Sequence, residues 1–222
     1  MNGLQKLEAR MIAANSLLCV GLDTDIRKLP LTAQNKDQPQ LAFNQSIIEK
    51  THPYAAAYKL NTAFYEARGV RGWEEMKATV AYLHHNHPDI FVIADAKRGD
   101  IGSTNEAYVQ AIYDELGFDA VTLHPYVGRE ALQPFLSRTD RVAIILCRTS
   151  SPEAGEFQDL DVDGRPLWMI VAEHVASKWN TANNCMLVVG ATYPLEMQRI
   201  RAVARDMTFL VPGIGGSSPL GS

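Results

Sequence analysis

The sequence has little of what marks a secreted, disulfide-bonded or membrane protein. Three cysteines occur among 222 residues, each in an apolar run, so we expect buried free thiols and no disulfide framework or zinc ribbon. No apolar stretch reaches the roughly 18 residues that a membrane span requires. The N-terminus lacks the cationic start and apolar centre of a signal peptide. Together these absences predict a cytoplasmic protein.

The sequence also lacks an excess of positive charge. Its formal net charge is −4 at pH 7, so we expect neither nucleic acid nor a membrane as a partner, and any anionic ligand would need a local site. A hydrophobic content of 46% over this length fits one globular domain. We expect that domain to span residues 1–215, and the glycine- and serine-rich residues 216–222 to be a flexible tail or a cloning scar.

Short apolar runs rich in β-branched residues alternate with stretches of helical periodicity. Strands are expected at Leu17–Asp23, Ala55–Asn61, Ile90–Lys97, Ala120–Tyr126, Val142–Ser150, Cys185–Thr192 and Phe209–Gly215. Helices are expected at Leu41–Thr51, Trp73–His85, Asn105–Leu116, Arg129–Leu136, Leu167–Trp179 and Leu195–Ala204. This alternation indicates a parallel sheet covered by helices. Seven such strands favour a (β/α) barrel over a doubly wound sheet, although periodicity alone leaves both open.

Polar residues gather at the carboxyl ends of these expected strands. They are Asp23, Lys59, Asp95, Lys97, His124, Arg148, Ser150 and Thr192. In an α/β barrel the active site is built at that end of the strands. Contact with water explains one or two polar residues there, but hardly two lysines and two aspartates together. We therefore expect the candidate active site at this end.

The segment Asp95–Asp100 (DAKRGD) carries the strongest chemical signal. On a strand, Asp95 and Lys97 point to the same side, and Asp100 follows in the next turn. Lys59 ends the neighbouring strand and can reach the same space. Alternating lysines and aspartates in a partly desolvated site keep one another charged. Such an array supplies an acid, Lys97, and a fixed negative charge near a group to be expelled; a structural ion-pair network is the alternative.

Three further segments give weaker signals. A capping box at Ser103–Glu106 predicts that a helix begins just after the charged segment. The stretch Ser150–Arg165 lacks periodicity and is expected to be a loop, either a lid over a ligand or a plain surface loop. The turn Pro212–Gly216 resembles a phosphate cradle but lacks the dinucleotide and P-loop spacings.

The histidines form no convincing metal-binding pattern. His84, His85 and His87 lie at a helix end before Pro88, where a solvated face is the expected role. His124 follows a strand and has no partner that is visible in the sequence, so we expect a packed, hydrogen-bonded side chain. We therefore predict no metal ligands.

Seven ordered motifs resemble the orotidine 5'-phosphate decarboxylase family, in particular its longer-chain, bacterial-type branch. The segment Asp95–Thr104 (DAKRGDIGST) resembles that family's D-x-K-x-x-D-I-x-x-T signature. The other resembling segments are Gly21–Asp23, Tyr58–Asn61, Val121–Tyr126, Arg148–Pro152, Val189–Thr192 and Val211–Gly215. The resemblance extends from Leu17 to Gly215.

The resemblance implies a (β/α)8 TIM barrel, usually homodimeric, that converts orotidine 5'-phosphate to UMP and CO2 in pyrimidine biosynthesis without a metal or organic cofactor. By match to the motif, Lys97 is implied as the proton donor to C6, and Asp95 as the carboxylate that faces the substrate's carboxylate. Lys59 and Asp100 would complete a charged tetrad. Asp100 and Thr104 would reach into the partner subunit's site.

The same resemblance implies substrate contacts outside the tetrad. Asp23 would bind a ribose hydroxyl, Ser150 would hydrogen-bond the pyrimidine, and Gly215 would lie in the phosphate-binding turn. That turn reads Gly-Gly-Ser-Ser here, without the family's glutamine, and no eighth strand with its phosphate-binding arginine follows it. We therefore expect a barrel whose eighth βα unit is missing from this chain.

Two other functions stay open on the sequence. One is a metal-dependent sugar-phosphate decarboxylase or aldolase of the same barrel type, which shares the Asp-x-Lys-x-x-Asp core. The other is an inactive, truncated fragment of the decarboxylase. A metal requirement would favour the first of these alternatives.

Overall fold

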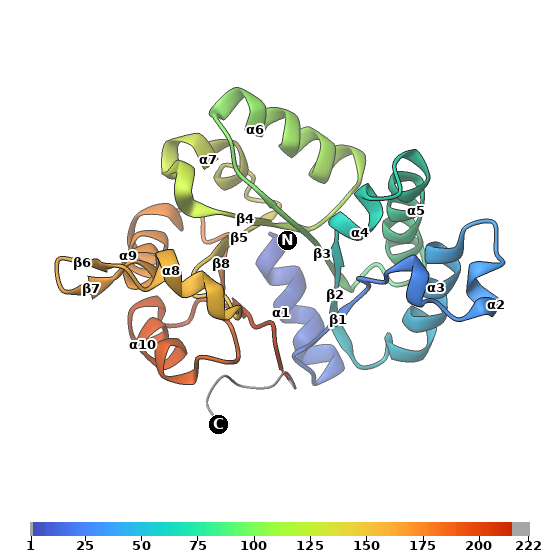
Figure 1. Ribbon diagram of the computed structural model, residues 1–222, viewed down its shortest axis with the longest axis horizontal. Coiled ribbons are helices and arrows are strands. Elements are labelled where there is room, and N and C mark those ends of the chain that lie inside the picture. Colours follow the sequence, from blue (N-terminus) through green and yellow to red (C-terminus); the bar gives the residue numbers. More distant parts are fainter. Residues whose placement is uncertain (1, 215–222) are drawn as a thin grey trace. The chain divides into compact units, whose positions relative to one another are not determined.

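A computed structural model of the protein describes residues 2–214, and its elements are labelled in Figure 1. Seven strands form one sheet in the order β1-β2-β3-β4-β5-β8-β9. They are β1 (Leu18–Gly21), β2 (Ala55–Asn61), β3 (Phe91–Arg98), β4 (Ala120–Leu123), β5 (Val142–Leu146), β8 (Cys185–Val188) and β9 (Phe209–Leu210). The pairs β1–β2, β2–β3, β5–β8 and β8–β9 are parallel. Each strand lies within or beside an apolar run that predicts it.

Helices separate consecutive strands of this sheet, as the periodicity predicts. The α-helices are α1 (Gly3–Ala14), α2 (Leu31–Gln34), α3 (Pro39–Thr51), α4 (Ala63–Glu66), α5 (Val70–Asn86), α6 (Gly102–Val109), α7 (Arg129–Leu136), α8 (Gly155–Gln158), α9 (Leu167–His174) and α10 (Pro194–Ala204). The 3-10 helices are η1 (Ile26–Lys28), η3 (Pro125–Val127) and η4 (Pro152–Ala154). The π-helical segments are η2 (Gln110–Glu115) and η5 (Val175–Trp179). None of the helices in residues 2–214 is long and apolar enough to cross a membrane.

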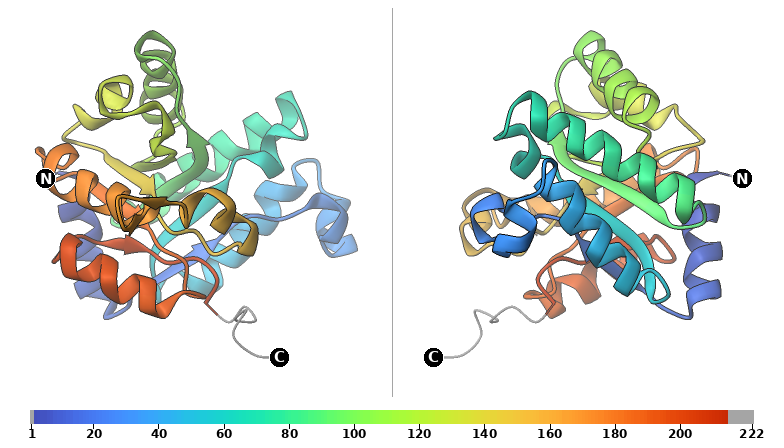
Figure 2. Two further views of the ribbon diagram at one scale, coloured as in Figure 1. Left: turned by 60° about the vertical axis from the view of Figure 1, so that its left-hand side comes forward. Right: turned by 90° about the vertical axis from the view of Figure 1, so that its right-hand side faces the viewer.

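The chain forms two compact units. Among the described residues, unit 1 holds 2–96 together with 107–121, and unit 2 holds 97–106 together with 122–214. In unit 1, α3 and α5 lie side by side (Figure 1 and Figure 2), and α1 packs on β2. In unit 2, α9 packs on α10 and α7 packs on β5. Strands β2, β3, β5 and β8 are buried over most of their length. Their nearly continuous apolar sequences predict this, because such strands are covered on both faces of a sheet.

Buried polar side chains connect the elements inside each unit. In unit 1 the Asp119 carboxylate accepts hydrogen bonds from Lys6 Nζ at 2.8 Å and from the Val92 backbone N–H at 2.9 Å. In unit 2 the fully buried Asn184 donates to the carbonyls of Leu136 and Arg138, at 3.1 and 3.0 Å. The bonds to the Val92 N–H and to the Leu136 and Arg138 carbonyls satisfy backbone groups, as buried polar groups require.

Two local features differ from what the sequence predicts. Helix α6 begins just after the charged segment, as the sequence predicts, but it begins at Gly102, so Ser103 lies inside the helix instead of capping it. The stretch Ser150–Arg165 is not an irregular loop: it contains η4, α8 and a two-stranded antiparallel ribbon of β6 (Asp161–Val162) and β7 (Arg165–Pro166). Gly215 and the tail expected at 216–222 lie outside the described residues.

The crossing of α4 and α5 depends on a glycine. A Cβ atom at Gly72 would lie 1.8 Å from the backbone carbonyl oxygen of Tyr65, so α4 and α5 approach too closely for any side chain. We expect Gly72→Ala to lower the free energy of unfolding by about 1–3 kcal/mol, the usual cost of overpacking. Thermal unfolding followed by circular dichroism measures this as a Tm several degrees lower.

Gly102→Ala is the matched control, because a Cβ at Gly102 in α6 meets nothing within 4 Å. Alanine also restricts the unfolded chain, so this variant is expected to unfold at the parent Tm or slightly above it. Equal Tm values for Gly72→Ala and Gly102→Ala would contradict the close helix crossing.

Candidate active site

Three charged side chains meet at the carboxyl ends of β1, β2 and β3 in unit 1. Lys59 Nζ lies 2.6 Å from Asp23 Oδ2 and 3.6 Å from Asp95 Oδ2. The three side chains are only 13–31% exposed. The expectation that Lys59 and Asp95 share one space is therefore confirmed. Asp23, which the family resemblance assigns to a ribose hydroxyl, is the closer carboxylate to Lys59.

Strand register produces this cluster. Gly21 pairs with Lys59 between β1 and β2, and Asn61 pairs with Asp95 between β2 and β3. Asp23 lies two residues after the end of β1, and its Oδ1 accepts a 2.7 Å hydrogen bond from the Asn61 backbone N–H. Parallel strands end at the same edge of a sheet, so residues that end three neighbouring strands are held close together.

The two carboxylates control the charge on Lys59. Burial alone would lower its pKa, but the attraction and hydrogen bond of Asp23, assisted by Asp95, outweigh that effect and raise the pKa above its ordinary value. Lys59 is therefore an ammonium group throughout the neutral range.

A buried hydrogen-bond chain supports the backbone that precedes Asp23. Tyr65 Oη donates to the Leu22 carbonyl at 2.8 Å. The Asn44 amide donates to Tyr65 Oη at 2.9 Å and to Thr79 Oγ1 at 3.0 Å. Tyr65 and Asn44 are fully buried, so these bonds hold the position of the loop that carries Asp23.

Lys97, at the end of β3, has a strained backbone. Its φ of +47° lies in the left-handed region, which non-glycine residues seldom adopt. The strand alternation used to align Lys97 with Asp95 therefore does not apply at this residue. The Lys97 backbone N–H donates to Thr122 Oγ1 at 3.0 Å, which fixes the unusual conformation from the next strand.

His124 holds the turn that follows Lys97. Its Nε2 lies 3.0 Å from the Gly99 carbonyl oxygen, and its backbone N–H donates to the Arg98 carbonyl at 3.0 Å. A Cβ at Gly99 would lie 2.5 Å from His124 Nε2, so only glycine fits against the imidazole. The prediction that His124 is a packed, hydrogen-bonded histidine is confirmed.

Asn105 organises the backbone around Asp100. This fully buried side chain accepts from the Asp100 N–H at 3.1 Å and donates to the carbonyls of Asp100 and Ala131, both at 2.6 Å. Asp100 Oδ1 accepts from the Ile101 N–H at 2.7 Å. Thr104 is half-buried in α6, the helix that follows. Sequence reasoning missed Asn105 and Thr122, because their partners are distant in the chain or on the backbone.

Ser150 lies in a tightly packed corner of unit 2. Its carbonyl accepts a 3.1 Å hydrogen bond from Thr192 Oγ1. A Cβ at Gly190 would lie 2.6 Å from Ser150 Cα, so the two backbones are in direct contact. Gly213 also faces the Ser150 side chain, since its Cβ would lie 3.4 Å from Ser150 Cβ. The ends of β5, β8 and β9 thus surround this serine.

Arg148 ties the segment after β5 to that same corner. Its side chain is 3% exposed, and its Nη2 lies 3.1 Å from Asp159 Oδ2, just beyond α8. Its guanidinium also stacks on the Tyr193 ring, with Cζ 3.7 Å from the ring centre. Gln158 Oε1 accepts from the Thr149 N–H at 2.9 Å. The segment that contains α8 is thereby fastened to the end of β5.

The predicted site residues are distributed over both units. Lys59, Asp95 and Asp23 come together in unit 1, whereas Lys97, Asp100, Thr104 and Ser150 belong to unit 2. Gly215 lies outside the described residues.

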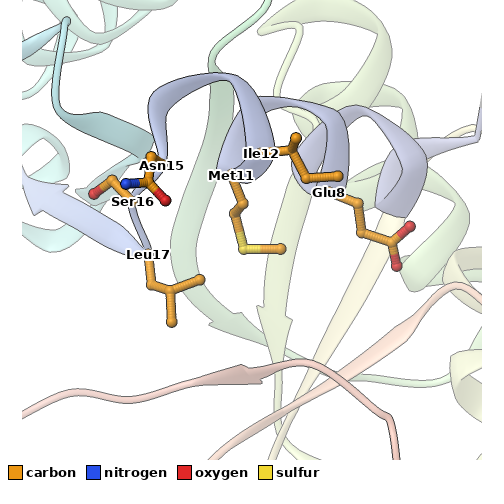
Figure 3. Close-up of a pocket in the computed structure, with 6 residues that line it drawn as sticks. All are labelled: Glu8, Met11, Ile12, Asn15, Ser16 and Leu17. Carbon is orange, nitrogen blue, oxygen red and sulfur yellow. The ribbon is translucent and has the colours of Figure 1, made fainter.

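A pocket of about 640 Å³ in unit 1 is separate from the charged cluster. It is lined by Glu8, Met11, Ile12, Asn15, Ser16 and Leu17 (Figure 3). These residues lie on α1 and just before β1, at the amino end of that strand, whereas Asp23 follows its carboxyl end. Among residues 2–214, none of the predicted site residues lines this pocket.

Residues 16–222 match the family model described as Orotidine 5'-phosphate decarboxylase / HUMPS family. The chain is 48% identical to the orotidine 5'-phosphate decarboxylase of Herpetosiphon aurantiacus, over 96% of this chain and 79% of that protein. It is 44% identical to the same enzyme of Christiangramia forsetii, over 95% of this chain and 77% of that protein.

Solved structures show the same similarity. The OMP decarboxylase of Leishmania donovani is 38% identical with a TM-score of 0.87, over 97% of this chain and 81% of that chain. A putative orotidine 5'-phosphate decarboxylase of Streptomyces avermitilis is 30% identical with a TM-score of 0.80. With the parallel strand order, this likeness confirms the expected α/β barrel class of fold.

We expect Asp23→Asn to lower the pKa of Lys59, because it removes the closer of two counter-charges and leaves Asp95 at 3.6 Å. Nuclear magnetic resonance of the lysine side chain over alkaline pH measures this. Asp25→Asn is the control, since Asp25 pairs with Arg27 at 2.7 Å. An unchanged Lys59 pKa in Asp23→Asn would contradict the assignment.

The same change has a signed effect on stability. Because the folded pKa of Lys59 is raised, its contribution to stability is present below the unfolded pKa of about 10.4. That contribution is lost as the pH rises through the folded pKa. In Asp23→Asn the total loss should therefore be smaller, and it should be complete at a lower pH.

Proposed function

Because the chain belongs to the orotidine 5'-phosphate decarboxylase / HUMPS family, we propose that it converts orotidine 5'-phosphate to UMP and CO2, a step of pyrimidine nucleotide biosynthesis. The observation that carries this proposal is 48% identity to an orotidine 5'-phosphate decarboxylase over 96% of the chain. The names of the relatives favour the decarboxylase over a metal-dependent sugar-phosphate enzyme. The protein is thus a carbon–carbon lyase; its cytoplasmic location stays a prediction.

The reaction requires stabilisation of a carbanion. When the bond from C6 to the carboxylate carbon breaks, CO2 leaves and the electron pair stays on C6, where the pyrimidine ring delocalises it little. A protonated Lys97 stabilises that charge and then transfers its proton to C6, which forms UMP; water reprotonates the lysine. Its fixed left-handed backbone supports this role, because strained residues persist where the surrounding structure over-determines them.

Asp95 and Lys59 maintain the electrostatics of the proposed site. Asp95 places a negative charge beside the substrate carboxylate, an unfavourable interaction that departure of CO2 relieves. Lys59 Nζ lies 3.6 Å from Asp95 Oδ2, and this ion pair holds the Asp95 carboxylate in position. In a homodimer, Asp100 is proposed to complete the tetrad of the partner's site. Its backbone is fixed by the buried Asn105, which supports a role that needs a defined position.

Substrate contacts follow from the remaining polar residues. Asp23 is proposed to bind a ribose hydroxyl in addition to Lys59 and the Asn61 N–H, since an ionised carboxylate has about four acceptor positions. Ser150 is proposed to hydrogen-bond the pyrimidine, and Gly215 to contact the phosphate. Binding energy from the remote phosphate would help hold the ring in its reactive position.

We expect Lys97→Ala to reduce decarboxylation by about 100-fold or more, because one group both stabilises the carbanion and delivers the proton. The absorbance change from orotidine 5'-phosphate to UMP measures the rate. Lys77→Ala is the control, since Lys77 forms an exposed ion pair with Glu115 at 3.5 Å. If Lys97→Ala folds and retains more than about a tenth of the parent rate, the assignment of Lys97 fails.

We also propose a homodimer with shared active sites, in which Asp100 and Thr104 reach into the partner's site. In a mixture of Asp100→Ala and Lys97→Ala chains, each inactive alone, a mixed dimer would contain one site with both defects and one with neither. Activity should therefore partly return after subunit exchange, which is verified with differently tagged chains. A mixture that exchanges and stays inactive would refute the shared site.

A further inference from the structure

A cluster of three metal-ligating side chains lies away from the proposed active site. Ligand atoms of Glu49, His52 and His87 all lie within 4.8 Å of one another. Glu49 is in the last turn of α3, His52 directly follows that helix, and His87 directly follows α5. All three belong to unit 1. The ends of two adjacent helices thus supply two imidazoles and one carboxylate.

The spacing is close to what a tetrahedral ion requires. Ligands about 2.0–2.1 Å from zinc lie roughly 3.3 Å apart, by the geometry of a tetrahedron. His87 Nε2 already lies 3.2 Å from Glu49 Oε1. The rings of His52 and His87 stack with centres 4.3 Å apart, and the ligand atoms of all three residues lie within 4.8 Å of one another. Rotation of the exposed Glu49 and the partly exposed His52 side chain would be required to bring all three ligands to the tetrahedral spacing.

Neighbouring groups orient these ligands. Tyr82 Oη donates a 2.6 Å hydrogen bond to Glu49 Oε1, an outer-sphere contact of the kind that fixes a ligating carboxylate. Arg10 Nη2 donates to the His52 carbonyl at 2.5 Å, which fixes the backbone of that ligand. The guanidinium charge is balanced by Asp89, at 2.7 Å from Nη1.

We propose that Glu49, His52 and His87 bind one divalent transition-metal ion, such as Zn²⁺, with water at the fourth position. Imidazole ligands suit zinc, nickel and copper, whereas Mg²⁺ prefers oxygen ligands alone. The ion would join the ends of α3 and α5 where they lead into β2 and β3. The ion would lie before β2, whose first residue is Ala55, whereas Lys59 lies four residues further along the strand, or about 13 Å. The ion would therefore stabilise the fold and take no part in decarboxylation.

The site differs from the histidine group that the sequence displays. His84 Nε2 contacts the Gly117 carbonyl oxygen at 2.7 Å, and His85 is exposed on α5. His87 alone of the three joins the cluster, and its partners come from α3. Thiols offer little competition for the metal, because burial raises the pKa of Cys147 and Cys185 to about 12.

The test is a titration of the tag-free, metal-free protein with Zn²⁺, followed by calorimetry and by the imidazole proton resonances. We expect one ion per chain, with resonance changes at His52 and His87. At an excess of about 100 times Kd, Zn²⁺ should raise Tm by roughly 5–10 °C. Mg²⁺ at the same concentration should neither change the His52 and His87 resonances nor raise Tm.

Variants separate this site from adventitious surface binding. Tyr82→Phe should weaken Zn²⁺ binding by about 10-fold, the smaller end of outer-sphere effects, and His87→Ala by more. His85→Ala is the matched control on the same helix and should bind like the parent. Glu49→Gln changes an exposed residue and decides the matter if His87→Ala folds poorly. The proposal is overturned by absent binding, by several ions per chain, or by equal affinity of Glu49→Gln and the parent.

Discussion

The contact between Lys59 and Asp23 is the interaction on which the candidate site depends. It joins the ends of β1 and β2, keeps a partly buried lysine charged, and leaves that charge available to Asp95 on β3. Without it, the partly buried ammonium group of Lys59 would lose its nearest counter-charge, and a buried charge without a close partner is costly to a fold. The buried hydrogen-bond chain through Tyr65 and Asn44 fixes the backbone of Leu22, the residue before Asp23.

Most of the fold follows from the sequence, because local rules determine it. Apolar runs bounded by polar residues locate all seven strands, and β2 matches its predicted bounds of Ala55–Asn61. The gathering of Lys59 and Asp95 is also predictable, since both end parallel neighbouring strands. The capping box at Ser103 correctly predicts a helix after the charged segment but misplaces its first residue, which is Gly102. The Asn105 side chain, inside that helix, binds the backbone carbonyls of Asp100 and Ala131.

The remaining features depend on contacts between residues distant in the chain. The left-handed backbone of Lys97 is fixed by Thr122, and the following turn by His124, neither of which a local pattern reveals. Folding likewise separates three histidines that are neighbours in sequence and unites His87 with Glu49 and His52. Family resemblance supplies the chemical roles that spacing leaves open, whereas the structure supplies the supporting residues.

The most direct test of the account measures CO2 release from carboxyl-labelled orotidine 5'-phosphate by the 222-residue chain after exhaustive treatment with EDTA. The proposed mechanism uses only side chains for the chemistry, so release should proceed and should be unchanged when Mg²⁺ or Zn²⁺ is added at 25 °C. Labelled CO2 and UMP should appear in equal amounts. Release that requires Mg²⁺, or no release by the folded chain, would contradict the assignment of a metal-independent decarboxylase.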